Sequence, residues 1–243
     1  MGRTEDSWYK VIPPNIDIIK CDLGDTAVQY LWKQIEKAKV EKENAGEYLA
    51  GNIKQSLYLQ DEDNYFWENH LKEYCEKYVS DYSHAVSFRN TFSNVYAGKL
   101  VMQEFWVNFS RQTEFNPLHN HGGALSFVIW MQIPTRSKEQ HNLPISKNTT
   151  SPASSDFMFT YTDILGTTQP MTWNMDPEIE GMMVVFPSTM PHQVYPFFNN
   201  EEERISISGN IYFDTDILRN KSGDIKFQNR KTLNSENWFE LKE

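Results

Sequence analysis

The chain has 243 residues, 39% of them hydrophobic and 23% charged, which is ordinary for a folded protein of one large or two small domains. Its net charge of −10 argues against a sequence-independent grip on nucleic acid phosphates or on an anionic membrane. The two cysteines, Cys21 and Cys75, exclude a small disulfide scaffold and lead us to expect free thiols in a reducing, intracellular compartment.

Residues 1–100 are expected to form a mostly helical layer with some extended pieces. Thr26 and Gln29 have the spacing of a capping box, and an apolar stripe over 28–38 predicts a helix that ends near Gly46. A second helix is predicted to start at the acidic residues 61–63. Its aromatic and apolar positions could line a pocket, but core packing is the better interpretation of Trp67, Leu71, Tyr74 and Tyr78.

From about residue 100 the hydrophobic period changes to two, which predicts strands at 101–109, 124–133, 156–163, 181–187 and 204–213. The polar segment 135–155 is expected to be a loop or lid between two of them. Residues 219–243 are expected to add a strand or a short helix. We expect one domain over 1–243, with the layer 1–100, a β barrel or sandwich over 100–215 and a C-terminal extension over 216–243.

Two histidines, His119 and His121, are separated by one residue in NPLHNHGG. In an extended chain such residues point to the same side, so both imidazoles can reach one metal ion. A hydrogen-bonded pair in a turn explains this motif about as well. The glycines that follow, Gly122 and Gly123, permit a tight bend and a close approach of the backbone.

A third histidine, His192, follows an apolar strand and a proline-bounded turn in GMMVVFPSTMPH. An antiparallel barrel can bring it opposite the first two histidines. Three neutral imidazoles would then occupy one face of a metal and leave other positions open, as an oxygen-activating iron requires. Taken alone, His192 is better explained as a loop histidine.

The strand that begins at Arg204 has two different faces. Isoleucines define one face, and the other carries Arg204, Ser206, Ser208 and Asn210. A guanidinium and a hydroxyl two residues apart suit a carboxylate, which the arginine binds through two parallel hydrogen bonds. If Arg204 points into a barrel, a dianionic ligand would balance its charge. The alternative is a polar face exposed to solvent.

The order H-x-H, distal histidine and R-x-S resembles the 2-oxoglutarate-Fe(II) oxygenase superfamily. The blocks LHNHGGALSFVIWMQIP and FPSTMPHQVYPF…ERISISGNI, within residues 100–215, resemble more narrowly oxygenases of the marine-phage and bacterial type. The resemblance implies a mainly β fold, the double-stranded β-helix or jelly-roll barrel. It also implies iron(II) at His119 and His192, and 2-oxoglutarate bound through Arg204 with the help of Ser206.

That resemblance further implies a hydroxylase that decarboxylates 2-oxoglutarate to succinate while dioxygen oxidises an unidentified primary substrate. Asn108 lies on the same predicted strand face as Trp106 and is a candidate to hydrogen-bond the co-substrate, although an ordinary barrel interior explains both residues equally well. We expect the enzyme to work in the cytoplasm, that of the host cell if a phage encodes it, with no nucleic acid or membrane partner.

His121 departs from the superfamily pattern, in which this position is Asp or Glu. A neutral ligand leaves the iron one unit more positive than two histidines and a carboxylate would. Two alternatives therefore stay open beside the oxygenase: a cupin-type metal enzyme that uses three histidines without 2-oxoglutarate, and a non-catalytic barrel such as a virion or assembly protein.

Overall fold

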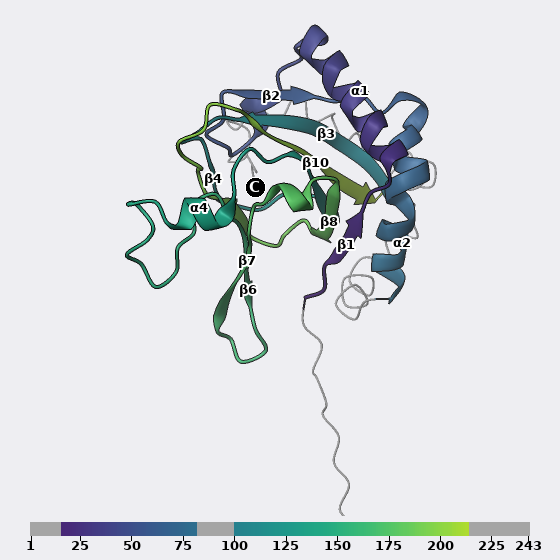
Figure 1. Ribbon diagram of the computed structural model, residues 1–243. Coiled ribbons are helices and arrows are strands. Elements are labelled where there is room, and N and C mark those ends of the chain that lie inside the picture. Colours follow the sequence, from purple (N-terminus) through teal and green to yellow (C-terminus); the bar gives the residue numbers. More distant parts are fainter. Residues whose placement is uncertain (1–15, 82–99, 214–243) are drawn as a thin grey trace, which may run out of the picture.

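The computed structural model describes residues 16–81 and 100–213 (Figure 1). Two antiparallel sheets form its centre. The larger has the order β1-β8-β5-β10-β3-β2, and the smaller has the order β4-β9-β6-β7. Their strands are β1 (Ile19–Asp22), β2 (Gln55–Tyr58), β3 (Leu100–Ser110), β4 (Asn116–His119), β5 (Leu125–Gln132), β6 (Phe157–Thr162), β7 (Thr168–Trp173), β8 (Met182–Pro187), β9 (His192–Val194) and β10 (Arg204–Phe213).

The path of the chain through β3 to β10 identifies the fold. The strands β3, β5, β8 and β10 belong to the larger sheet, and β4, β6, β7 and β9 belong to the smaller one. This repeated crossing between two facing sheets is the topology of an eight-stranded jelly roll. The expected double-stranded β-helix is therefore confirmed, and all five predicted strands lie within one residue of their expected bounds at either end.

The helices pack against the outer face of the larger sheet (Figure 1). They are α1 (Asp25–Glu41) and α2 (Lys72–Asp81), the latter continuing from the π-helix η3 (Trp67–Leu71). Shorter 3₁₀ turns are η1 (Gly46–Tyr48), η2 (Glu62–Asn64) and η4 (Pro177–Ile179).

One hydrophobic core joins the helices to the larger sheet, and it includes Leu31, Leu71 and Ile207. A second core, around Trp130, Phe159 and Phe186, lies between the two sheets. β5 contributes to both cores, which explains its continuous apolar sequence. The isoleucine face of β10 is buried against the helices, as expected from its alternation.

Two expectations about the first helix are wrong. Its N-cap is Gly24, Thr26 lies inside the first turn, and no side chain makes a cap hydrogen bond. The helix ends at Glu41 and not near Gly46, because Lys42 takes the left-handed conformation with φ of 55°.

The second helix was predicted to start at residues 61–63, and it begins just after them, at residue 65, behind the 3₁₀ turn η2. The Asp61 carboxylate accepts hydrogen bonds from the backbone N–H groups of Phe66 and Trp67, at 2.8 and 2.9 Å. Trp67, Leu71 and Tyr78 are buried in the core and Tyr74 packs against it, so the core interpretation is confirmed. The π-helical turn was not predicted.

Segment 135–155 does connect two strands, but it is not a simple loop. It contains α4 (Ser137–His141), and four of its serines, Ser137, Ser146, Ser154 and Ser155, are buried. Ser137, for example, donates from both its N–H and its hydroxyl to Asp176. Polar composition therefore did not indicate exposure here.

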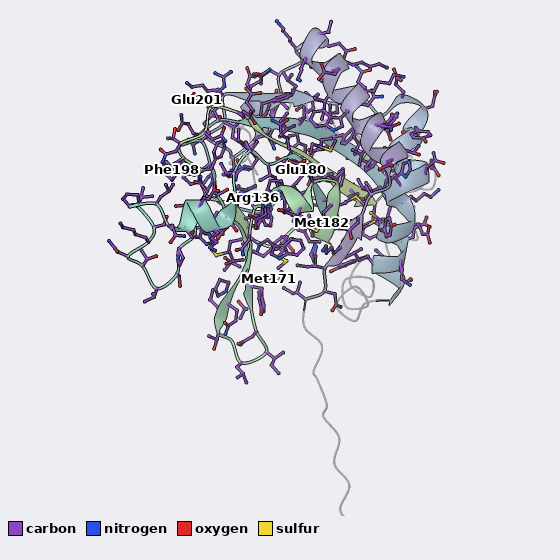
Figure 2. The ribbon with its side chains drawn as sticks, viewed as in Figure 1. Arg136, Met171, Glu180, Met182, Phe198 and Glu201 are labelled. Carbon is purple, nitrogen blue, oxygen red and sulfur yellow. The ribbon has the colours of Figure 1, made fainter. Side chains whose placement is uncertain are left out.

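The β6–β7 hairpin extends away from the rest of the fold, and Met171 lies on it (Figure 2). None of the helices in residues 16–81 and 100–213 is long and apolar enough to cross a membrane. The predicted element within 219–243 lies outside the described residues, and the expectation of one domain over the whole chain stays a prediction.

Candidate metal and co-substrate site

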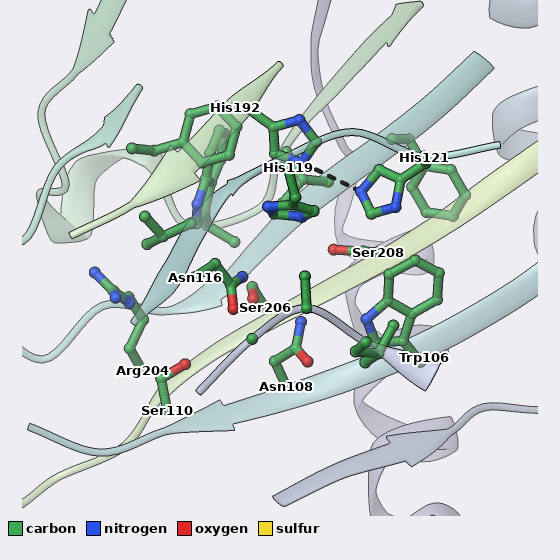
Figure 3. A pocket seen from close by; sticks show the side chains of 18 of the residues that line it. Trp106, Asn108, Ser110, Asn116, His119, His121, His192, Arg204, Ser206 and Ser208 are labelled. Carbon is green, nitrogen blue, oxygen red and sulfur yellow. Dashed lines mark hydrogen bonds between the residues drawn. The ribbon is translucent and has the colours of Figure 1, made fainter. Parts of the chain in front are cut away.

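The three candidate histidines meet in the space between the two sheets (Figure 3). His119 ends β4 and pairs across the sheet with His192, the first residue of β9. His121 follows two residues later, and its Nε2 lies 3.2 Å from Nε2 of His192. The potential ligand atoms of all three lie within 4.8 Å of one another. The structure therefore brings the three predicted residues together.

The bend after the H-x-H motif depends on Gly123. Its φ is +100°, and a Cβ there would lie 2.7 Å from the carbonyl oxygen of Ile211. Both features favour glycine. The Ser188 hydroxyl donates to the Gly123 carbonyl at 2.6 Å, and the His121 N–H donates to the Ser188 carbonyl at 2.8 Å. The close backbone approach expected of this motif is thus present at Gly123.

The hydrogen bonds of two imidazoles fix their tautomers. Nδ1 of His119 lies 2.7 Å from the Pro117 carbonyl, and Nδ1 of His192 lies 3.0 Å from the Met190 carbonyl. A carbonyl only accepts, so Nδ1 carries the proton and the Nε2 lone pair is free for a metal. This arrangement of donor atoms is the one that a divalent metal requires.

Burial keeps the three rings neutral. It lowers the pKa of His121 to about 4, helped by His119, and that of His192 to about 3, helped by both other imidazoles. Burial also lowers the pKa of His119, although its backbone hydrogen bonds oppose the effect. Neutral imidazole is the form that binds metals.

Arg204 lies in the wall of the same pocket, with 3% of its surface exposed. Burial lowers its pKa to about 10, so it stays a cation at neutral pH. Nη1 donates to the Ser155 carbonyl at 2.8 Å and Nη2 to the Tyr195 carbonyl at 3.1 Å. Within residues 16–81 and 100–213, Arg204 forms no ion pair with an acid. A buried cation in this state is stabilised by an anionic ligand.

The rest of the pocket combines apolar side chains with several hydrogen-bond donors. Ser206 and Ser208 extend from β10 beside Arg204, and their cross-strand partners Asn108 and Trp106 lie next to them on β3 (Figure 3). The Asn108 Oδ1 accepts from the Ser56 hydroxyl at 2.7 Å, which leaves its Nδ2 for the pocket. No aspartate or glutamate is among the described residues that line this pocket. The chemistry suits a dianion.

Ser110 and Asn116 are polar pocket residues that were not identified from the sequence. Ser110 continues the alternation of Trp106 and Asn108, so extending that strand by one residue would have found it. Asn116 begins β4, and no sequence pattern distinguishes it from other loop amides. Conversely, Asn210 does not line the pocket, because it accepts a hydrogen bond from Ser126 and donates to Glu104 beyond it.

Residues 104–210, which contain all of these pocket features of the jelly roll, match the family model described as "Putative 2OG-Fe(II) oxygenase". This part of the chain is thus similar to the 2-oxoglutarate-Fe(II) oxygenases. Members of this family use iron(II), 2-oxoglutarate and dioxygen, and the pocket of this chain is suited to the first two. Three imidazoles whose ligand atoms lie within 4.8 Å of one another suit the metal, and a buried arginine that forms no ion pair suits the dianion.

Solved structures similar to this chain include several prolyl hydroxylases. The prolyl-4-hydroxylase of Pseudomonas putida is 15% identical, with 82% of this chain and 94% of that chain covered and a TM-score of 0.41. A Trichoplax adhaerens prolyl hydroxylase, solved with a peptide fragment of the hypoxia inducible factor oxygen degradation domain, is 14% identical, with 86% and 87% covered and a TM-score of 0.43. The viral collagen prolyl hydroxylase of Paramecium Bursaria Chlorella virus-1 is 13% identical, with 80% and 94% covered and a TM-score of 0.40. No curated protein matches the chain.

Proposed function

We propose that this protein is an oxygenase and hydroxylates its primary substrate with iron(II) held by His119, His121 and His192. In the same proposal the far carboxylate of 2-oxoglutarate binds Arg204 and Ser206, and Asn108 donates a further hydrogen bond from Nδ2. The observation that carries the proposal is the buried, unpaired guanidinium of Arg204 in a pocket that also contains the three Nε2 atoms.

The bound iron and 2-oxoglutarate supply the oxidising chemistry, in which the co-substrate loses carbon dioxide and becomes succinate. The protein orients the co-substrate and excludes water. Arg204 and Ser206 fix one end of it, and the histidines define the position of the reacting end. Trp106, 4% exposed, lies next to His121 with ring centroids 5.9 Å apart and closes that side of the site against solvent.

A three-histidine metal enzyme that does not use 2-oxoglutarate has less support. It would need another partner for the charge of Arg204. No acid in the part of the chain that the structure describes forms an ion pair with this arginine, and the buried Asp156 acts on it only at longer range. A non-catalytic barrel would not need three neutral imidazoles with ligand atoms within 4.8 Å of one another, two of them with Nε2 left for a metal by a hydrogen bond at Nδ1.

The test is anaerobic addition of iron(II) to the apoprotein, followed by 2-oxoglutarate. Bound together they give a visible metal-to-ligand charge-transfer band. Arg204→Ala should bind iron like the parent and lose the band at co-substrate concentrations that saturate the parent. The matched control is Arg111→Ala. Arg111 is an exposed arginine at the end of β3, and its Nε lies 3.2 Å from the Glu203 carboxylate just before β10.

Failure to take up iron would contradict the metal assignment. Iron uptake without the band in the parent would favour the enzyme that does not use 2-oxoglutarate. An unchanged band in Arg204→Ala would show that the far carboxylate of 2-oxoglutarate does not bind Arg204.

The proposal places the reaction in the cytoplasm, with which the two free thiols of Cys21 and Cys75 agree. The net charge of −10 supports a primary substrate other than a nucleic acid.

A further inference from the structure

The guanidinium of Arg204 is held from behind by a small clamp of backbone. The carbonyls of Ser155 and Tyr195 accept its hydrogen bonds, and its Cζ lies 5.3 Å from the centroid of the Phe197 ring. These residues come from two segments that are tied together. The Ser155 N–H donates to the Pro196 carbonyl at 2.9 Å, and the Tyr195 N–H donates to the Asp156 carbonyl at 2.8 Å.

Asp156 is the acid whose charge acts on Arg204. It is fully buried, and its charge partly opposes the effect of burial on the pKa of Arg204. It nevertheless makes no ion pair with the arginine. Its Oδ2 lies 2.7 Å from Nε2 of His141, and its Oδ1 makes no hydrogen bond of normal geometry within the described ranges. Burial raises the pKa of this carboxyl, and His141 and the backbone N–H of Met175 oppose that effect. A buried carboxylate with a free oxygen is a potential competitor for a nearby guanidinium.

His141 is held in place by α4, of which it is the last residue. At the start of that helix, Ser137 donates to Asp176 at 2.8 and 2.7 Å. Gln140 donates to the Phe198 carbonyl and accepts from the Phe198 N–H, both at 2.9 Å. The helix is therefore fixed by contacts that do not involve Asp156. Its position, and not the hydrogen bond to Asp156, sets the direction of the His141 ring.

We propose that His141 is a positioning residue for the co-substrate: it holds Asp156 through the hydrogen bond between Nε2 and Oδ2, and so keeps this carboxylate from pairing with Arg204. The guanidinium then stays open to the far carboxylate of 2-oxoglutarate. The segment 137–156 is in this sense part of the co-substrate site and not a lid over it. The inference rests on the proposed role of Arg204.

Two amide variants of His141 separate loss of the hydrogen bond to Asp156 from loss of the imidazole ring. In His141→Gln the side-chain amide reaches the position of Nε2 and can still donate to Asp156, whereas in His141→Asn it reaches only as far as Nδ1. The control within the same segment is Arg136→Gln, just before α4 (Figure 2), which breaks only an exposed ion pair with Glu178. Binding of 2-oxoglutarate is measured by calorimetry without oxygen, on protein loaded with manganese(II) in place of iron(II), so that no turnover contributes.

We expect His141→Asn to weaken 2-oxoglutarate binding about tenfold, the lower end of what loss of an outer-sphere partner costs at metal sites. Manganese affinity should be unchanged, and His141→Gln and Arg136→Gln should bind 2-oxoglutarate like the parent. The double variant His141→Asn with Asp156→Asn should regain affinity, because the competing charge is gone. If His141 has a merely structural role, the double variant should bind 2-oxoglutarate more weakly than His141→Asn, because each change would disturb the same buried pair.

Parent-like affinity in His141→Asn, or weaker binding in the double variant than in His141→Asn, overturns the inference. Should His141→Asn not fold, Asp156→Asn alone decides: binding at least as tight as the parent supports the inference, and weaker binding overturns it. Arg204→Ala distinguishes a failure of the proposed function from a failure of the role of His141. If it keeps parent affinity, the proposed function fails. If it loses affinity while His141→Asn does not, only the role of His141 fails.

Discussion

At the scale of single residues, Asn108 connects the pocket to the N-terminal layer. Its Oδ1 accepts from Ser56 of β2 at 2.7 Å, and both side chains are buried. Asn108→Ala leaves the Ser56 hydroxyl buried without a partner, which should lower the free energy of unfolding by about 1–3 kcal/mol. It should also weaken 2-oxoglutarate binding, because Nδ2 is lost from the pocket. Denaturant unfolding and calorimetry measure the two effects.

Ser56→Ala is the matched variant, since it breaks the same hydrogen bond from the other side and keeps the pocket amide. We expect it to lose stability but to bind 2-oxoglutarate more tightly than Asn108→Ala does. Equal affinity in the two variants would show that Asn108 acts on the pocket only through folding.

His121 is the residue at which this chain departs from the family pattern, and its place beside His192 makes the departure testable. His121→Asp replaces a neutral ligand by an anionic one, which attracts a divalent cation more strongly. We expect iron(II) affinity at least equal to that of the parent, measured by anaerobic titration. His119→Ala, which removes a ligand with no replacement, should lose iron. Loss of iron in His121→Asp as well would count against position 121 as a ligand.

At the scale of elements, β10 shows what alternation can and cannot predict. Its two faces were predicted correctly because ten residues give enough periods: isoleucines face the helices, and Arg204 and Ser206 face the pocket. β4 and β9 have four and three residues, too few for a periodic signal, although they carry two of the three histidines. The hydroxyl-rich segment before β6 was expected to be a loop because composition does not tell an exposed serine from a hydrogen-bonded buried one.

β10 also contains a position where only glycine fits. A Cβ at Gly209 would lie 2.5 Å from the Glu104 carbonyl oxygen on β3 and 2.5 Å from a ring carbon of Phe127 on β5. Gly209→Ala should therefore overpack the centre of the larger sheet and lower the free energy of unfolding by about 1–3 kcal/mol. Gly24→Ala, at a site with no atom within 4 Å, is the control and should cost less in the same denaturant experiment. Similar losses at both sites would mean that strand packing is not the cause.

At the scale of the whole molecule, the arrangement of the layers could be predicted because hydrophobic period changes from helical to extended near residue 100. The site could be predicted because each of its parts is a short motif: H-x-H, a distal histidine and R-x-S. The residues that hold the Arg204 guanidinium in place could not be predicted from the sequence. His141, Asp156 and Ser155 lie within 15 residues of each other in the sequence. The hydrogen bond of Ser155 with Arg204 and that of His141 with Asp156 nevertheless depend on how the two sheets face each other.

Burial in the helix-facing core has a consequence for stability at alkaline pH. Cys75 of α2 is fully buried, and desolvation raises the pKa of its thiol well above the usual 9.0. The unfolded chain releases this proton near pH 9, whereas the folded protein retains it. Stability that is fully present below pH 9 should therefore fall as the pH rises above it, by about 1.4 kcal/mol per pH unit for one proton.

Tyr30 adds to this loss from about pH 10, because burial and its hydrogen bond to Asp61 raise its pKa in the folded state. Cys75→Ala isolates the thiol. The variant should be less stable at pH 7, since it leaves a small cavity, but its stability should depend less on pH between 9 and 10, where Tyr30 does not yet contribute. Reversible urea unfolding in the presence of a reductant at several pH values measures both slopes. Parallel curves for the parent and Cys75→Ala over that interval would show that the thiol ionises equally in both states, and that the core around α2 admits water.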